Sequence, residues 1–325
     1  MKLYVARCTT NALTSLEGYS EALGALLEAE GHKVQFLELP PVSAPGRSLT
    51  NIASLRLWES APYADTLICL DAISAVLQHP RKIVFLLDDT YLDSDRSVSA
   101  SEPAGEREYL ANLLKVALGE AKAIFVPSRF AGSRLRFLAN DRWQLLQPHF
   151  APSKFRYARN PGPELLVLNP LNDRQRPELL IDCLAELPES FRVRWVASYR
   201  DAATLVRVVD LARNAGIEHR VAFDVRSIND GEKAYLLAHA AALLELAPAK
   251  LAVSDSVHHA NQIGVPVISC SDGGALAEGT VAYPRPDGAA LATAIRSVCP
   301  ATLKPSVSRG ALRTSWAPLL EAIGR

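Results

Sequence analysis

The stretch "HANQIGVPVISCSDGGALAE", residues 259–278, decides the fold. Its centre, "VPVIS", is an apolar run of strand length, and the polar residues "SDGG" follow almost at once. Glycine has no side chain, so the backbone N–H groups of Gly273 and Gly274 can approach a diphosphate or sugar hydroxyls closely. The stretch therefore predicts a buried strand that runs into a ligand-binding turn.

Short apolar runs like this one alternate with helical patterns along the whole chain. Such nearly continuous runs are typical of strands that are buried on both faces of a parallel sheet. The series restarts after residues 147–164, which are rich in Pro and Arg, and 325 residues are many for one domain. The sequence therefore predicts an α/β protein with two doubly wound Rossmann-like domains, residues 1–155 and 156–308, and an interdomain cleft.

Composition excludes several classes of protein. The 35 basic residues balance 35 acidic ones, which argues against a nucleic-acid partner. Five cysteines without a C-x-x-C motif argue against a disulfide framework and a zinc ribbon, and they suit a reducing compartment. The N-terminus lacks the apolar core of a signal peptide, and no run approaches ~18 apolar residues. We expect a cytoplasmic protein.

Several chemical motifs are absent. The sequence has no phosphate loop of the kinase type, no G-x-G-x-x-G fingerprint and no G-x-S-x-G elbow. Asp93 and Asp95 in "DSD" are interpreted as part of a solvated loop, the alternative being the carboxylate pair that holds a metal and diphosphate in some sugar transferases, which the motif resembles. His258 and His259 are adjacent, so on a helix they point about 100° apart and seldom share an ion. We expect neither a metal site nor a bound cofactor.

The second half of the chain resembles the retaining GT-B glycosyltransferases, in particular those of family 4. The matching positions are Gly264, Pro266, Val267, Ile268, Ser271, Gly273, Gly274 and Glu278. Other segments resemble the family more loosely, including "RTSWAPLLEAI", which is similar to the helix that crosses back to the first domain; we assign residues 309–325 to it. The resemblance implies transfer of a sugar from a UDP- or GDP-sugar to a glycan, lipid-linked or protein acceptor.

Several family positions carry other residue types here. The positions of the two family glutamates are occupied here by Leu251 and His259, and those of the family's Arg and Lys lie near Pro170 and Gln175. Asp88 stands in place of a first-domain histidine. Thr14 and Ser15 stand in place of the paired glycines before the first helix, whereas Glu17 retains the acidic residue of that motif. The diphosphate that leaves carries negative charge, and losing one group that stabilises it typically costs about 10²–10³ in rate. Activity therefore requires substitutes.

Substitutes for the lost residues are available in the sequence. Arg174 and Arg176 flank Gln175 and could contact the diphosphate, or they could be turn arginines. Ser254 could contact sugar hydroxyls together with Asp255, or it could cap a helix. His259 could bind the ribose or the base, or it could pack within its helix. Glu278 could bind the donor sugar, or it could be a surface residue. Asp88, Thr14, Ser15 and Glu17 are the candidates for binding the acceptor.

Two interpretations of the function remain. The first is an active glycosyltransferase with a diverged site, and the second is a catalytically inactive GT-B-like protein that binds a glycan or a partner protein. A sugar epimerase of the same architecture is a third, weaker alternative. The basic segment with Arg129, Arg134, Arg136 and Arg142 is either a solvated face or a contact with anionic lipid, which would place the protein at the inner face of the membrane.

Overall fold

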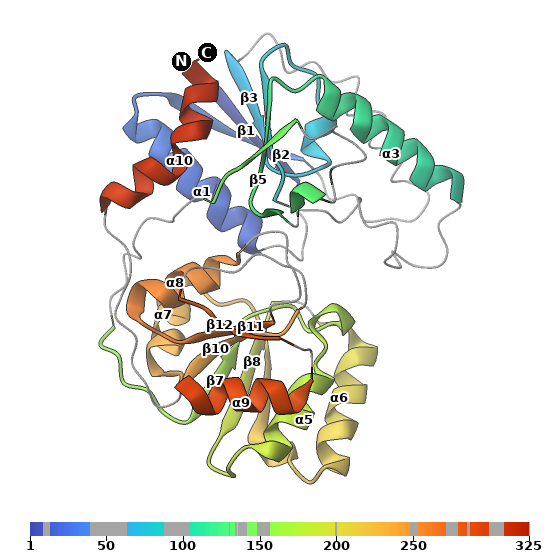
Figure 1. The fold of residues 1–325 in the computed structure, drawn as a ribbon, viewed down its shortest axis with the longest axis vertical. Coiled ribbons are helices and arrows are strands. Elements are labelled where there is room, and N and C mark those ends of the chain that lie inside the picture. Colours follow the sequence, from blue (N-terminus) through green and yellow to red (C-terminus); the bar gives the residue numbers. More distant parts are fainter. Residues whose placement is uncertain are drawn as a thin grey trace. The chain divides into compact units, whose positions relative to one another are not determined.

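The computed structural model shows an α/β protein with two compact units (Figure 1). It describes residues 1–8, 14–39, 64–87, 104–129, 131–133, 135, 142–147, 157–198, 200–247, 253–270, 279–284, 287–298 and 309–324. Unit 1 holds Met1–Phe150 and Arg309–Arg325, and unit 2 holds Ala151–Ser308. Each unit has its own six-stranded parallel sheet, so the predicted pair of doubly wound, Rossmann-like folds is confirmed.

The sheet of unit 1 has the strand order β2-β1-β3-β4-β5-β6. Its strands are β1 (Lys2–Cys8), β2 (Lys33–Leu39), β3 (Thr66–Cys69), β4 (Lys82–Phe85), β5 (Ala123–Val126) and β6 (Trp143–Leu145). The helices are α1 (Thr14–Ala29), η2 (Ser74–Val76), α3 (Ala104–Gly119) and α10 (Arg309–Gly324). The central strands β3 and β4 are buried along their whole length, as their apolar runs predict.

The C-terminal helix α10 packs on unit 1 beside α1 (Figure 1). The Trp316 ring of α10 meets the Phe85 ring of β4 edge to face at a centroid distance of 5.9 Å. Tyr19 of α1 meets the same Phe85 ring at 6.0 Å. In addition, an Nη2–H of Arg81 donates to the carbonyl of Ile323 at 3.1 Å. The chain therefore returns to the first unit at its C-terminal end.

The sheet of unit 2 has the strand order β12-β11-β10-β7-β8-β9. Its strands are β7 (Glu164–Val167), β8 (Arg192–Ala197), β9 (Val221–Val225), β10 (Ala242–Glu245), β11 (Val267–Cys270) and β12 (Val281–Tyr283). The helices are η3 (Asp173–Gln175), α5 (Glu178–Glu186), α6 (Ala202–Asn214), η4 (Glu218–Arg220), α7 (Asp230–His239), α8 (Asp255–Ile263) and α9 (Gly288–Val298). The short strand β12 has no counterpart among the predicted strands.

Helices cover both faces of the sheet of unit 2 (Figure 1). One core layer joins the sheet to α5, α6 and α9, through residues such as Leu180, Val208 and Leu291. The other layer joins it to α7 and α8, through residues such as Leu237 and Val257. Because both faces are buried, the central strands β7, β10 and β11 are mostly apolar, and polar groups reach ligands mainly at the strand ends.

Two further expectations concern cysteines and membranes. Cys69, Cys183 and Cys270 are buried thiols outside any disulfide, and burial raises the pKa of both the Cys69 and the Cys183 thiols to about 12. These thiols are therefore protonated at neutral pH. Among the helices that the structure describes, none combines the length and the apolar character needed to cross a bilayer.

Candidate functional site

The order of strands in unit 2 identifies where a ligand would bind. From β7 the chain proceeds to β8 and β9 on one side, whereas β10, β11 and β12 follow on the other side. The connections from β7 and β10 therefore leave the sheet in opposite directions. In doubly wound sheets, such a switch point opens a crevice at the carboxyl ends of the two strands. The residues that follow β7 and β10 are the candidates.

A hydrogen-bonded bridge spans this switch point. Glu245 is the last residue of β10 and is 1% exposed. Its Oε1 accepts from Nδ2 of Asn169, beyond β7, at 3.3 Å and from the hydroxyl of Ser254 at 3.0 Å. Trp195 Nε1–H in turn donates to the Asn169 carbonyl at 2.8 Å. These bonds offset the cost of burying a carboxylate, and they fix the two loops relative to each other.

The bridge contains two residues that the sequence analysis did not single out, Asn169 and Glu245. The signal for Glu245 was a single acidic residue within the apolar run "AALLELA", residues 241–247. A glutamate seldom lies fully buried in a strand unless it has partners. The sequence offered no comparable signal for Asn169.

The N-terminus of α8 lies on the β10 side of the switch point. Ser254 is its N-cap, and the Ser254 hydroxyl accepts from the N–H of Val257 at 3.3 Å. The capping interpretation of Ser254 is therefore confirmed, while contact with a sugar stays a prediction. Gly264 closes the same helix with φ of 74°, a left-handed conformation that favours glycine and directs the chain into β11.

Asp255, in the first turn of α8, pairs with a lysine of α7. Asp255 is 5% exposed, and its Oδ2 accepts from Lys233 Nζ at 2.7 Å. Lys233 Nζ also lies 3.4 Å from Asp230 Oδ1. Burial alone would lower the pKa of Lys233, but Asp255 and Asp230 together raise it above its ordinary value. The two charges therefore neutralise each other within the protein.

His259 lies one turn beyond Asp255 on the same helix face. Burial lowers the pKa of His259, and the nearby Lys233 charge lowers it further. The imidazole is therefore neutral at pH 7, and its buried Nδ1 has no hydrogen-bond partner. Among the residues described, no group of three or more His, Cys, Asp or Glu side chains is arranged to hold a metal ion.

The loop on the β7 side of the switch point contains the helix η3. Arg176, which follows η3, has φ of 45° and ψ of 58°, a left-handed conformation that costs a residue with a side chain about 1–2 kcal/mol. Gln175 is 8% exposed, and its Oε1 has no hydrogen-bond partner; neither has the buried Oδ1 of Asn172. Strained backbone and unpaired buried acceptors are features that cluster at ligand sites.

The charge of Arg176 acts on Tyr283, a residue of β12. Burial raises the pKa of the Tyr283 phenol at the end of β12; neighbouring Cys270 raises it further and the Arg176 guanidinium lowers it. Both Arg176 and Cys270, the last residue of β11, therefore affect the pKa of Tyr283. The segment that continues from Cys270 contains Gly273 and Gly274, which lie outside the described residues.

The remaining predicted residues are only partly described. Asp88, Gly273, Gly274 and Glu278 lie outside the described residues, and so do Asp93, Asp95, Arg134 and Arg136. Thr14, Ser15 and Glu17 form the first turn of α1, and Arg174 lies in η3, but the structure describes the backbone alone at these four positions. The geometry therefore assembles Arg176, Ser254, Asp255 and His259 at one edge of unit 2 and leaves the acceptor side as predicted from sequence.

This chain is similar to known proteins in its structure, whereas comparisons of its sequence found no match. No protein-family model matches the chain, and no curated protein matches its sequence. Sucrose-phosphate synthase from Thermosynechococcus elongatus is similar with a TM-score of 0.71 at 16% identity, covering 100% of this chain and 94% of that one. Such a likeness below 25% identity is a likeness of fold.

Two further structures lead to the same fold. Anabaena HepE in complex with UDP-glucose gives a TM-score of 0.66 at 14% identity, over 100% of this chain and 95% of that one. WaaG, a glycosyltransferase involved in lipopolysaccharide biosynthesis, gives a TM-score of 0.62 at 17% identity, and the match covers 99% of this chain and 94% of that one. The two-domain α/β architecture of this chain is thus the one found in GT-B glycosyltransferases.

Proposed function

We propose that this protein is a nucleotide-sugar-dependent glycosyltransferase that retains the configuration of the transferred sugar. The observation that carries the proposal is the switch point of unit 2, where Arg176 in left-handed backbone and the capped N-terminus of α8 follow neighbouring central strands. A guanidinium suits a diphosphate, and carboxylates suit hydroxyl groups. The fold shared with HepE, which was crystallised with UDP-glucose, supports this class of donor.

In this proposal, positive charge on the η3 side meets the diphosphate as it leaves. Arg176, assisted by Arg174, takes the place of the family's basic residues, and Gln175 lies between them. Backbone N–H groups at Gly273 and Gly274 contribute further donors. Each such group acts on charge that develops during the reaction, so losing one typically lowers the rate by about 10²–10³.

The other predicted residues bind hydroxyl groups. Neutral His259 and the carboxylate of Asp255, with Glu278, face the ribose or the donor sugar, while Asp88 and the first turn of α1 serve the acceptor. The donor is a UDP- or GDP-sugar, and the reaction uses no bound cofactor. The acceptor is a glycan, a lipid-linked sugar or a protein; a lipid-linked acceptor would place the protein at the inner face of a membrane.

Calorimetric titration tests the proposal directly. Wild-type protein is titrated with UDP, GDP, UDP-glucose and GDP-mannose, next to the double variant Arg174→Ala/Arg176→Ala. We expect micromolar binding of one nucleotide family and a loss of at least tenfold in the double variant, because it removes both cations from the diphosphate. Arg213→Ala, which alters an exposed pair with Asp210 on α6, is the control and keeps wild-type affinity.

The alternative is a catalytically inactive GT-B-like subunit. The observation that favours it is the internal use of polar groups: the hydroxyl of Ser254 caps α8 and binds Glu245, and Asp255 is paired with Lys233. Wild-type protein that binds none of the four nucleotides would support this alternative. The search would then turn to a partner protein or a glycan.

A further inference from the structure

The residue that anchors Arg176 is Asp173, and it is held at two points. Its backbone carbonyl accepts the N–H of Arg176 at 3.0 Å. Its carboxylate Oδ1 accepts from the hydroxyl of Thr204, in the first turn of α6, at 2.8 Å and also from the guanidinium of Arg207 on α6. Asp173 therefore connects the left-handed residue to a helix that begins far along the chain, with Thr204 31 positions away.

A second set of hydrogen bonds joins the N-terminus of α6 to the loop that contains η3. The N-cap Asp201 accepts from the N–H of Thr204 at 3.0 Å and from its hydroxyl at 2.6 Å. The N–H of Asp201 donates to the Leu171 carbonyl at 2.8 Å. The hydrogen bond from the Thr204 hydroxyl lowers the pKa of Asp201. Thr204 is 2% exposed, so its hydroxyl is a fixed part of this junction.

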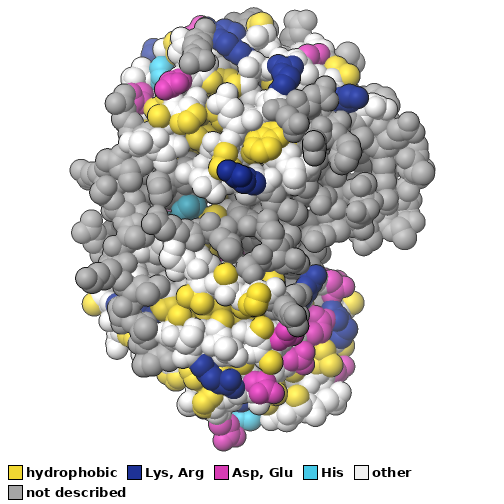
Figure 2. Space-filling view, viewed as in Figure 1, with side chains coloured by type: hydrophobic (Ala, Val, Ile, Leu, Met, Phe, Trp, Pro, Cys, Tyr) yellow, Lys and Arg dark blue, Asp and Glu magenta, His cyan; other side chains and the backbone are white. Residues whose placement is uncertain are grey.

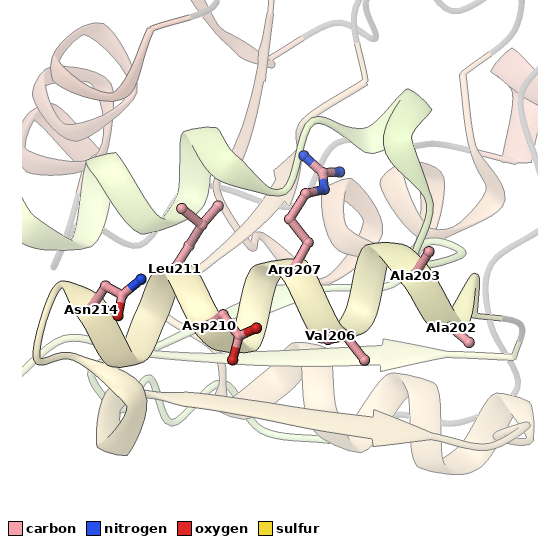
Figure 3. A pocket seen from close by; sticks show the side chains of 7 residues that line it. All are labelled: Ala202, Ala203, Val206, Arg207, Asp210, Leu211 and Asn214. Atoms are coloured by element: carbon pink, nitrogen blue, oxygen red, sulfur yellow. The ribbon is translucent and has the colours of Figure 1, made fainter.

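Arg207 completes the junction. Its side chain points from α6 toward the ribbon of η3 and α5, whereas Val206 and Asp210 point to other sides of the helix (Figure 3). Besides Asp173 it binds Glu178, in the first turn of α5. Acidic and basic side chains accordingly gather over this part of unit 2 (Figure 2). A threonine hydroxyl has one proton for two carboxylates, so the Arg207 guanidinium is a second protein donor to Asp173, whose side chain is 76% exposed.

We propose that Thr204 and Arg207 are positioning residues that hold η3, and thereby Arg176, in the conformation that receives the diphosphate. The inference rests on the proposed function for its ligand. A left-handed residue with a side chain persists only where its surroundings fix it, and Asp173 is the connection through which α6 does so. A displacement of about 1 Å at such a residue can cost up to about 10²-fold in rate.

The first arm of the test needs no ligand. Hydrogen exchange of the amides of Arg176 and Leu179 is compared in wild type, in Thr204→Val/Arg207→Ala and in Arg213→Ala. We expect exchange at both amides to accelerate at least tenfold in the double variant and to stay unchanged in Arg213→Ala. The single variant Thr204→Ser keeps the hydroxyl, so we expect both amides to exchange as in wild type. Unchanged exchange in the double variant would overturn the proposal, whatever the protein binds.

The second arm uses a thermodynamic cycle with Arg176→Gly. Affinity for the nucleotide that wild type binds is measured for the Thr204→Val/Arg207→Ala pair in both backgrounds. We expect about a fivefold loss when Arg176 is present and no further loss in the Arg176→Gly background. Equal losses in both backgrounds would show that α6 does not act through Arg176. Wild type that binds no nucleotide would refute the proposed function alone, because the exchange arm still decides the positioning role.

Discussion

On the β10–α8 side of the switch point the carboxylates bind partners within the protein, although the buried Nδ1 of His259 has none, whereas on the β7–η3 side two buried amide oxygens have no hydrogen-bond partner. Glu245, Ser254 and Asn169 form one hydrogen-bonded bridge, and Asp255 is neutralised by Lys233. On the η3 side, Gln175 and Asn172 each keep an oxygen without a hydrogen-bond partner, next to Arg176 in left-handed backbone. The carboxylates of the first side are thus already bound within the protein, whereas the amide oxygens of the second side are not.

This difference assigns chemistry to the two sides. The carboxylate of Glu245 lies beside the N-cap of α8, at a helix end where anions commonly bind. A diphosphate would be repelled there and attracted by Arg176. Hydroxyl groups, in contrast, can donate to carboxylates. Under the proposed function, we therefore expect the diphosphate of a nucleotide sugar toward η3 and its hydroxyl groups toward α8.

Removing the carboxylate of Glu245 should have the largest effect on stability. Glu245→Ala deprives Asn169 and Ser254 of their acceptor and leaves a cavity between β7 and β10, so we expect a loss of about 3 kcal/mol in the free energy of unfolding. Urea denaturation followed by circular dichroism measures it. Exposed Glu189→Ala on the same unit is the control. A loss below about 0.5 kcal/mol would contradict the bridge.

The Lys233–Asp255 pair comes next. Lys233→Met leaves the buried Asp255 without its cation, and we expect a loss of about 2 kcal/mol, less than for a fully buried pair because Lys233 is 13% exposed. The control is Arg192→Met, which removes a cation from an exposed position of β8. Equal denaturation midpoints for the two variants would show that the pair is no more than a surface contact.

The framework of this site was predictable because it depends on local pattern. The run "VPVIS" became β11, and the glycine before it ends α8 in left-handed backbone. Both follow from apolar strand residues and from the conformational freedom of glycine, which need no knowledge of distant contacts. The helix-capping role of Ser254 was one of two predicted alternatives for the same local reason.

The polar bridge was not predictable because its members are far apart in the chain. Asn169 and Glu245 are separated by 76 positions, and Lys233 and Asp255 by 22. Their pairing is set by the order of strands and helices in three dimensions, and a single sequence does not record it. The left-handed conformation of Arg176 was hidden as well, because arginine itself gives no sign of positive φ.

Arg176→Gly should separate stability from binding on the η3 side. Glycine adopts φ of 45° without strain, so we expect the free energy of unfolding to rise by about 0.5 kcal/mol, after allowing for the greater freedom of glycine in the unfolded chain. Nucleotide affinity should fall at least tenfold, because the guanidinium is lost. Denaturation and calorimetry on the same samples measure both quantities.

Arg176→Ala is the matched variant for this prediction. It removes the charge but keeps a Cβ in left-handed backbone, so affinity should fall as in Arg176→Gly while stability does not rise. Unchanged affinity in both variants would remove Arg176 from the ligand site. A loss of stability in Arg176→Gly would mean that the side chain contributes more through packing than the strained backbone costs.

His259 should give the smallest effect, a pH dependence of stability confined to the α8 side. Burial and Lys233 hold the pKa of His259 below its ordinary value, whereas the unfolded chain titrates near pH 6.5. As the pH falls through about 6.5, the unfolded state therefore takes up this proton first, and stability decreases on acidification. His259→Gln should flatten the change in unfolding free energy between about pH 7.5 and about pH 5.5. Exposed His219→Gln is the control for loss of a surface histidine. If wild type and His259→Gln lose stability equally over this range, burial and the Lys233 charge do not hold the imidazole neutral in the folded protein, and the chemistry assigned to the α8 side loses its neutral histidine.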